Sequence, residues 1–576
     1  STAIPTDRDD ESEEYFALYL TLTLLWMAFS FMVGTWLEHW DVHRLSHKGV
    51  VVIFGIIAGV LIRYMGSGMS ATAVFDAKSC TLLLLPAIVF ETGYNMRTKG
   101  IFFKNIGTIL IYAVFGATVS TLLTGMMLAL LFKFKFFGDI NFSVMECLIF
   151  SALITTTDSG STVSAFTKLS ADPMLAMIIY GESTINDAVS IVMYNTFSKL
   201  LLSPMSFTTL LIAGLDIIGM TIGSTLIGIV VALICTLVLK YMRFTSAVTE
   251  TVIIFLTAYL AFEVTEVIEY SGITATLACG LTLNYFAMHN LSKASQEFTQ
   301  QTVKVAASIA DTLIFFQVGE NVFLNESLKD IPWKMVLSVF VIIIISRTIV
   351  VTTITYPINL KRTRSKITPS SQMMMIYASM RGSMSYSLAL SFPSHNQAIA
   401  TRVTMWIIIL TIFTFGTTTY DMIHLLDIPL NCMYDTGAQS TKKRSIMATD
   451  GSPAAWFTGV IERYVIPFFT KDTSQLEEPL MSVSDLDKES SLYKTPRDAY
   501  LSRSPSSRHA TSSVMRVVKG RDGKTFVNNV ADVEAEEKED DKDMFLISDD
   551  EVDKELKGAR GSNMSVSRLS NSMRNS

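Results

Sequence analysis

The segment Gly181-Glu-Ser-Thr-Ile-Asn-Asp-Ala-Val189 places two carboxylates and an amide inside the apolar run 174–197. Asp187 falls near the middle of that run. A charged side chain in the middle of a bilayer costs several kcal/mol and is tolerated only with a partner, a polar cavity or a function. The segment therefore predicts a membrane protein with a polar site in its interior.

The composition supports a membrane protein. Half of the 576 residues are apolar and only 17% are charged. Apolar runs near twenty residues recur along the chain, and that length crosses about 30 Å of hydrocarbon as a helix. The runs are continuous and do not alternate in period two, which excludes a transmembrane β-barrel. We expect an all-α, polytopic fold in contact with membrane lipids.

Thirteen segments are candidates for transmembrane helices. They are 15–34, 50–65, 80–93, 107–132, 143–166, 174–198, 208–239, 247–268, 272–287, 303–324, 333–357, 371–393 and 401–425. One alternate set of connecting loops is richer in Lys and Arg and is predicted to be cytosolic. That set includes Arg44, Lys48, Arg97, Lys168, Arg243 and Lys293.

This orientation divides the chain into three parts. Residues 1–14 are predicted to be lumenal or extracellular, and 15–428 form the transmembrane domain. Residues 429–576 are predicted to be a cytosolic regulatory tail, largely disordered after about 475 because it is rich in serine and charge. We expect cytosolic regulators to bind this tail. Two glycosylation sequons, at Asn141 and Asn325, fall in outer loops.

Polar residues interrupt two of the apolar runs. The fifth run contains Thr155-Thr-Thr-Asp-Ser-Gly-Ser-Thr162, and the twelfth contains Ser379-Met-Arg-Gly-Ser-Met-Ser385. Broken helices in matching positions are typical of transporters built from two inverted repeats. Their opened backbone offers carbonyls to a cation if it lines a polar cavity. Three residues are predicted to support the breaks: Gly160, Arg381 and Gly382.

The intramembrane charges predict a division of roles. Arg347 in the eleventh run needs an acid, and Glu182 is the best candidate for a structural charge pair. Asp187 is then left to exchange a proton for Na+ or K+. Burial disfavours the charged form of a carboxyl group, so a proton and a cation can compete for it. Thr157, Ser183 and Asp158 could complete an oxygen shell; for Asp158, a packing role is equally compatible with the sequence.

Other chemistries have little support. The five cysteines form no CxxC pair, and only His424 of the seven histidines lies within a predicted span. There is no nucleotide-binding loop, and the acidic tail implies no nucleic-acid partner. We therefore expect no enzymatic activity and no cofactor beyond the transported ions.

At these residues the sequence resembles the eukaryotic sodium/proton exchanger family over about 15–428. The segments that carry the resemblance are 84–94 (Leu-Leu-Pro-Ala-Ile-Val-Phe-Glu-Thr-Gly-Tyr), 181–189, 271–280 (Ser-Gly-Ile-Thr-Ala-Thr-Leu-Ala-Cys-Gly), Arg347 and 380–384 (Met-Arg-Gly-Ser-Met). The 284–292 and 464–470 segments look most like the organellar, Golgi-type branch.

The resemblance implies a fold and a set of roles. It implies a homodimer of thirteen-helix subunits with elevator-like alternating access. The family's ion-binding aspartate matches Asp187, and Asn186 directly before it is predicted to bind the ion as well; an Asn-Asp pair marks the electroneutral members. The charge pair of the family matches Glu182 and Arg347, and its broken-helix aspartate matches Asp158.

Two positions depart from the family pattern. Ser159 follows Asp158 where the family usually has proline, so Gly160 and the hydroxyls must open the helix instead. In the third segment, Pro86-Ala87 replaces a usual Pro-Pro pair.

Together these observations predict an electroneutral Na+ or K+/H+ antiporter that regulates lumenal or cytosolic pH. The membrane would be that of the Golgi or endosomes, or the plasma membrane. A cation channel or uniporter of the same fold and a signalling scaffold impaired in transport are the alternatives. The sequence does not decide between Na+ and K+.

Overall fold

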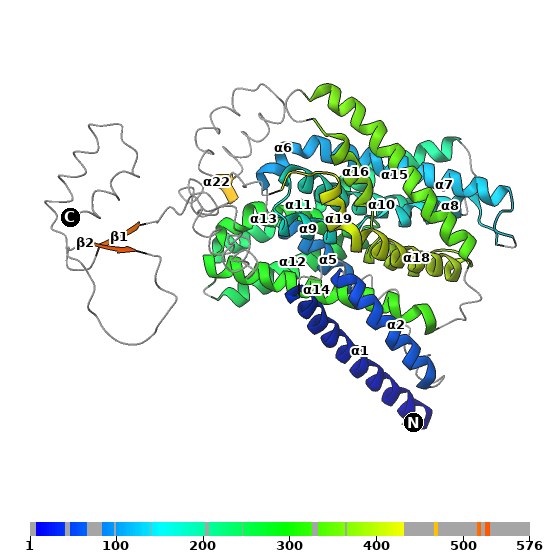
Figure 1. Cartoon of the computed structure of the whole chain (residues 1–576), viewed down its shortest axis with the longest axis horizontal. Coiled ribbons are helices and arrows are strands. Elements are labelled where there is room, and N and C mark those ends of the chain that lie inside the picture. Colours follow the sequence, from blue (N-terminus) through cyan, green and yellow to red (C-terminus); the bar gives the residue numbers. More distant parts are fainter. Residues whose placement is uncertain are drawn as a thin grey trace, which may run out of the picture. The chain divides into compact units, whose positions relative to one another are not determined.

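The computed structural model of the chain describes residues 7–40, 46–65, 83–96, 99–138, 140–201, 207–242, 244, 246–324, 332–362, 366–430, 466–469, 515–519 and 525–529. The chain divides into two compact units, Ser1–Met481 and Ser482–Ser576. The described residues of the first unit are helical, with short connections (Figure 1).

The helices of the first unit pack in two groups, which we name after a central helix of each. The α14 group comprises α1 (Asp7–His39), α2 (His47–Met65), α5 (Leu85–Tyr94), α11 (Phe207–Met242), α12 (Ala247–Val267), α13 (Gly272–Phe286), η3 (Ala287–Asn290) and α14 (Lys293–Leu324). A short tail helix, α22 (Ile466–Phe469), contacts α11 of this group.

The α10 group contains the remaining helices. It comprises α6 (Lys99–Leu110), η2 (Ile111–Gly116), α7 (Ala117–Lys133), α8 (Val144–Thr155), α9 (Gly160–Lys168), α10 (Pro173–Lys199), α15 (Trp333–Lys361), α16 (Pro369–Tyr377), α17 (Ser383–Leu390), α18 (Gln397–Thr411), η5 (Ile412–Gly416) and α19 (Thr417–Leu425). The two groups meet where α10 contacts α11 and α13, where α14 contacts α17 and α18, and where α2 contacts η5.

The α10 helix carries the segment 181–189 and contacts α6, η2, α7, α8 and α9 of its group. Asp172 caps its start by accepting a hydrogen bond from the Met174 amide at 2.9 Å, and Pro173 occupies the first turn. Most of its side chains from Leu175 to Phe197 are buried. Protein surrounds this helix, which explains how it can keep polar residues that lipid would exclude.

Each of the thirteen predicted segments overlaps a helix, but the count of thirteen membrane spans is not confirmed. Eight helical segments of the described residues are long and apolar enough to cross a membrane. The other predicted spans differ for three reasons. The α5 and α13 helices have only 10 and 15 residues, α10 is rich in polar residues, and two predicted spans are each divided into two helices.

Both predicted helix breaks are present. The fifth predicted span ends as α8 at Thr155 and resumes as α9 at Gly160, and the twelfth ends as α16 at Tyr377 and resumes as α17 at Ser383. No proline opens the first break. Gly160 starts α9, and its amide donates to the Asp158 carboxylate at 2.9 Å.

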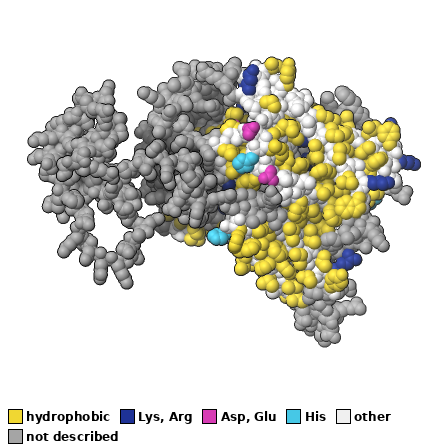
Figure 2. Space-filling view, viewed as in Figure 1, with side chains coloured by type: hydrophobic (Ala, Val, Ile, Leu, Met, Phe, Trp, Pro, Cys, Tyr) yellow, Lys and Arg dark blue, Asp and Glu magenta, His cyan; other side chains and the backbone are white. Residues whose placement is uncertain are grey.

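Large apolar side chains cover the outer helices. On α12 the exposed positions include Val252, Leu256 and Leu260, which recur at every fourth residue. Figure 2 shows hydrophobic side chains over much of the described surface facing the viewer, with few charges among them. A soluble monomer does not expose continuous apolar surface of this kind, so this surface is suited to lipid.

The second unit contains a two-stranded antiparallel sheet, β1 (Met515–Lys519) and β2 (Thr525–Asn529), with Val517 opposite Val527. The sequence analysis expected disorder here and did not anticipate these strands, although Val517, Val518, Phe526 and Val527 favour extended backbone. The rest of the tail after residue 469 lies outside the described residues.

Candidate ion site at the crossing of two broken helices

The two helix breaks cross each other. The Asp158 amide donates to the Met380 carbonyl at 2.8 Å, which joins one opened backbone to the other. The Arg381 guanidinium donates to the carbonyls of Thr155 and Thr156 at 3.3 and 3.1 Å. These carbonyls have lost their helical partners, and a buried carbonyl without a partner is costly. Arg381 therefore supplies hydrogen bonds to the free carbonyls at the end of α8, which is the support predicted for it.

Gly382 permits the crossing. A Cβ atom at this position would lie 2.7 Å from the Asp158 Cβ atom, closer than two carbon atoms can approach. The predicted support residues Gly160, Arg381 and Gly382 are thus all found at the crossing.

The α10 helix presents Asp187 and Ser183 to the first break. The Thr157 amide donates to Asp187 Oδ1 at 3.2 Å, and the Ser183 hydroxyl donates to the Thr157 carbonyl at 2.6 Å. Within the described residues, no ion pair includes Asp187. The first helix break therefore lies against Asp187, the carboxylate predicted to titrate.

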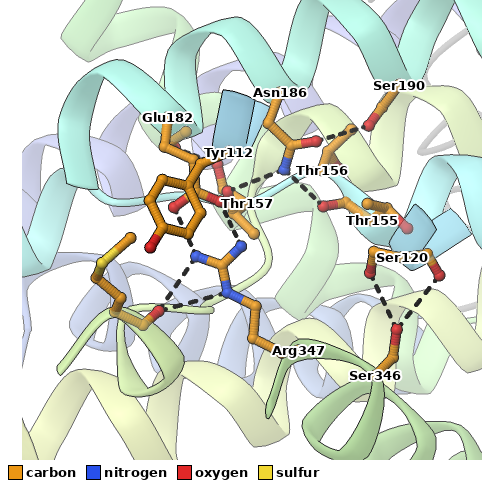
Figure 3. Close-up of polar contacts among 12 residues, drawn as sticks. Tyr112, Ser120, Thr155, Thr156, Thr157, Glu182, Asn186, Ser190, Ser346 and Arg347 are labelled. Carbon is orange, nitrogen blue, oxygen red and sulfur yellow. Dashed lines mark hydrogen bonds and ion pairs between the residues drawn. The ribbon is translucent and has the colours of Figure 1, made fainter. Parts of the chain in front are cut away.

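Asn186, which directly precedes Asp187 on α10, holds the same break in place. Its amide nitrogen donates to the Thr155 carbonyl at 3.0 Å and to Thr157 Oγ1 at 3.3 Å. Its own oxygen accepts from the Ser190 hydroxyl at 3.1 Å (Figure 3). Both ends of the amide are thus occupied by protein groups, which suits a bracing residue better than a direct ion ligand.

Glu182 and Arg347 form a buried ion pair between α10 and α15 (Figure 3). One guanidinium nitrogen contacts Glu182 Oε1, and the other donates to Glu182 Oε2 at 2.7 Å. The second nitrogen also donates to the Met375 carbonyl at the end of α16, at 3.2 Å. The residues are only 2% and 9% exposed, so the two charges neutralise each other away from water.

The Asp158 carboxylate contacts a side chain of the α14 group. Its Oδ2 atom contacts the Lys48 ammonium of α2, which also lies 3.1 Å from Asp311 Oδ2 on α14. The Ser383 hydroxyl at the start of α17 donates to Asp311 Oδ1 at 2.8 Å. The sequence analysis counted Lys48 as a loop charge, which was wrong: Lys48 lies in the first turn of α2 and is paired with carboxylates.

The structure thus brings together Thr157, Ser183, Asn186 and Asp187 and turns Asp158 to a second cluster. Sequence reasoning missed Lys48 in this role because 110 residues separate it from Asp158. One signal was available: a lysine in the first turn of a helix is disfavoured by the helix dipole, so it needs an acid nearby. Of the two sequons, Asn141 is exposed, and Asn325 lies outside the described residues.

Two of the family-like segments have a packing role. A Cβ atom at Gly93 of α5 would lie 2.8 Å from the Leu277 carbonyl of α13, and one at Gly280 would lie 2.9 Å from the Phe90 carbonyl. The segments 84–94 and 271–280 therefore form a close helix–helix contact through glycines.

Known proteins are similar to this chain in sequence and in fold. A family profile described as "Sodium/hydrogen exchanger, transmembrane" matches residues 20–422. The chain is 31% identical to sodium/hydrogen exchanger 8 of Homo sapiens over 435 residues, which is 73% of this chain and 74% of that protein. It is 28% identical over 450 residues to the endosomal/prevacuolar sodium/hydrogen exchanger of Saccharomyces cerevisiae, covering 74% and 70% of the two chains.

A solved structure supports the fold. The sodium proton antiporter MjNhaP1 from Methanocaldococcus jannaschii superposes with a TM-score of 0.55 at 17% identity, covering 72% of this chain and 98% of that chain. The profile match, the human relative and the crossed broken helices agree: the chain belongs to the sodium/hydrogen exchanger family.

Proposed function

We propose that this chain exchanges Na+ or K+ for a proton at Asp187. Cation/proton antiport is the activity of its family, and the observation that supports Asp187 as its site is geometric. Asp187 accepts from the opened backbone at Thr157, whereas the other acid on α10, Glu182, is already neutralised by Arg347. Asp187 is thus the α10 carboxylate left to carry a proton or to face a cation.

The break beside this carboxylate contains oxygen atoms of the kind that a hard cation prefers. Thr157 Oγ1 and the Ser183 hydroxyl both lie in the hydrogen-bond network of the break, and Asp158 follows Thr157 along it. Asn186 contributes by holding the Thr155 carbonyl and the Thr157 hydroxyl in place. A proton and a cation that compete for one carboxylate give exchange when only the occupied site can cross.

The two helix groups supply a means of crossing. The α10 group contains both breaks and Asp187, and it contacts the α14 group through few helices. We propose that the α10 group moves against the α14 group and exposes Asp187 to each side in turn. One site that carries either one proton or one monovalent cation makes the exchange electroneutral.

The test uses vesicles reconstituted with the purified chain and a pH-sensitive dye in the lumen. Gradients of Na+, K+ and Li+ should each be tried, since the ion preference is open. Asp187→Asn should abolish cation-driven proton flux, because an amide can neither release a proton nor neutralise a cation. The matched control is Asp216→Asn, an exposed position on α11, which should leave flux unchanged.

The same vesicles separate the alternatives. Cation flux that continues without a pH change identifies a channel or uniporter, and absence of flux in the unmodified chain identifies a transport-impaired scaffold. Normal exchange by Asp187→Asn would refute the assignment of the site.

The remaining properties are proposals that rest on the relatives. The name of the yeast relative places that protein in endosomal and prevacuolar membranes, which supports an endosomal or Golgi membrane for this chain. We propose a homodimer, a regulatory tail and glycosylation at Asn141 and Asn325. Tagged-chain imaging, mass measurement in detergent and glycosidase digestion test these points.

A further inference from the structure

Lys48 connects the two helix groups at the candidate site. Its ammonium contacts Asp158 at the α8–α9 break and lies 3.1 Å from Asp311 on α14. It also lies 4.7 Å from the ring centre of Phe315, one turn further along α14. The side chain is 21% exposed, so water and small reagents can reach this cluster.

The charges of this cluster do not balance. Asp158 and Asp311 carry two negative charges, and among the described residues the ion pairs of both involve Lys48 alone. A hydrogen bond from Gly160 or Ser383 to each carboxylate stabilises its charge but does not neutralise it. A second cation would therefore be attracted to this cluster, and it would compete with Lys48 for Asp158.

The position of Lys48 makes it displaceable. It lies in the first turn of α2, where the helix dipole repels a positive charge, and α2 has no acidic residue in that turn. Its ammonium is held by Asp158, Asp311 and the Phe315 ring. A lysine side chain is long and flexible, and it can leave one carboxylate while keeping the other.

We propose that Lys48 is a tethered cation: it occupies the Asp158 carboxylate when no transported ion is present, and the incoming Na+ or K+ must displace it. This inference rests on the proposed exchange at Asp187, because Asp158 directly follows Thr157. Lys48 is a positioning residue rather than a ligand of the ion. By competing for Asp158, Lys48 sets the cation concentration at which the site is half filled.

The prediction is a change in KM for the cation. Lys48→Met keeps most of the side-chain volume and removes the charge, so the cation no longer competes with an ammonium group. KM for Na+ or K+ should fall by about fivefold, the size expected for a partly exposed ion pair. KM is measured in vesicles at fixed pH. The cation concentration is varied on the predicted cytosolic side, which is the side of the loop that carries Arg44. Lys48→Arg keeps the charge and should leave KM near or above that of the unmodified chain.

A chemical rescue separates the charge from the fold. Cys80 and Cys432 lie outside the described residues and are replaced by Ser, while Cys147, Cys235 and Cys279 are buried and are kept. In this background Lys48→Cys should show the low KM of Lys48→Met. Reaction with aminoethyl methanethiosulfonate adds an ethylammonium group to the thiol and should restore the high KM. A neutral thiosulfonate of the same size should not.

The outcomes are distinct from those of the Asp187 test. If Asp187→Asn abolishes flux but the KM of Lys48→Met is unchanged or higher, the tethered-cation role is wrong and the exchange site stands. If the two thiol reagents act alike, the charge of Lys48 has no part in cation access, and the proposal fails even where Lys48→Met folds poorly.

Discussion

At the residue scale, the two acids of α10 differ because of what faces them. Glu182 faces the forked guanidinium of Arg347, which the Met375 carbonyl also holds in place. Asp187 instead accepts a hydrogen bond from the Thr157 backbone amide. A bidentate pair fixes both side chains and leaves neither available for exchange. Two acids five residues apart in the same helix therefore differ: Glu182 is held in an ion pair, and Asp187 is the one for which we propose exchange.

This difference predicts opposite effects on stability. Glu182→Gln or Arg347→Met leaves one buried charge unpaired and should cost about 3–5 kcal/mol of folding free energy. The melting temperature of the detergent-purified protein should therefore drop clearly. Asp187→Asn removes a charge that no described residue pairs and should melt at or above the temperature of the unmodified chain.

The double variant Glu182→Met/Arg347→Met provides the control. It removes both charges together and should regain part of the stability lost by each single change. A double variant less stable than both single variants would show that the pair is not the cause of the loss.

At the element scale, glycines decide which helices approach closely. A Cβ atom at Gly55 of α2 would lie 2.2 Å from the Phe316 carbonyl of α14, and one at Gly319 of α14 would lie 2.3 Å from the Val52 carbonyl. The two backbones therefore touch, which is a common way for helices to associate where the hydrophobic effect is absent. This contact also fixes Lys48 on α2 relative to Asp311 on α14.

A matched pair of glycine substitutions tests this contact. Gly55→Ala should lower the melting temperature, because the added methyl group forces α2 and α14 apart. Gly219→Ala on α11 adds the same methyl group where no atom lies within 4 Å, and it should be neutral or slightly stabilising. Equal melting temperatures for the two variants would contradict the close packing of α2 and α14.

At the scale of the whole molecule, the exchange that we propose requires movement between the two helix groups. The Asp311–Ser383 hydrogen bond joins α14 to α17 across the groups, and the Ser120–Ser346 hydrogen bond joins α7 to α15 within the α10 group. The two contacts are of similar length, at 2.8 and 3.1 Å, but only the first spans the boundary that has to move.

Cross-linking at the two places should therefore differ. In the cysteine background defined above, the flux that Asp311→Cys/Ser383→Cys retains should be lost when a short bis-thiosulfonate is added, and it should return when the disulfides are reduced. Ser120→Cys/Ser346→Cys should react with the same reagent and keep its flux. If the cross-link between the groups left flux intact, exchange would not depend on their relative motion.

The sequence predicted the features that depend on local composition. Apolar runs predicted the helices, the polar segments 155–162 and 379–385 predicted both breaks, and a carboxylate within an apolar run identified Asp187. Each of these signals lies within about twenty residues, the length of one membrane helix. The pairing of Glu182 with Arg347 was also within reach, since few intramembrane charges were available to choose from.

The tertiary structure alone decided which residue faces Asp158. Hydropathy shows that a helix is buried or exposed, but not which helices meet or at what height. Close glycine contacts set those positions, and they bring Lys48, Asp158 and Asp311 together from α2, the first break and α14. The sequence by itself determined a membrane protein with an acid in its interior. The packing of its helices decided which acid is paired with an arginine, which has no ion pair among the described residues, and which is held by a lysine.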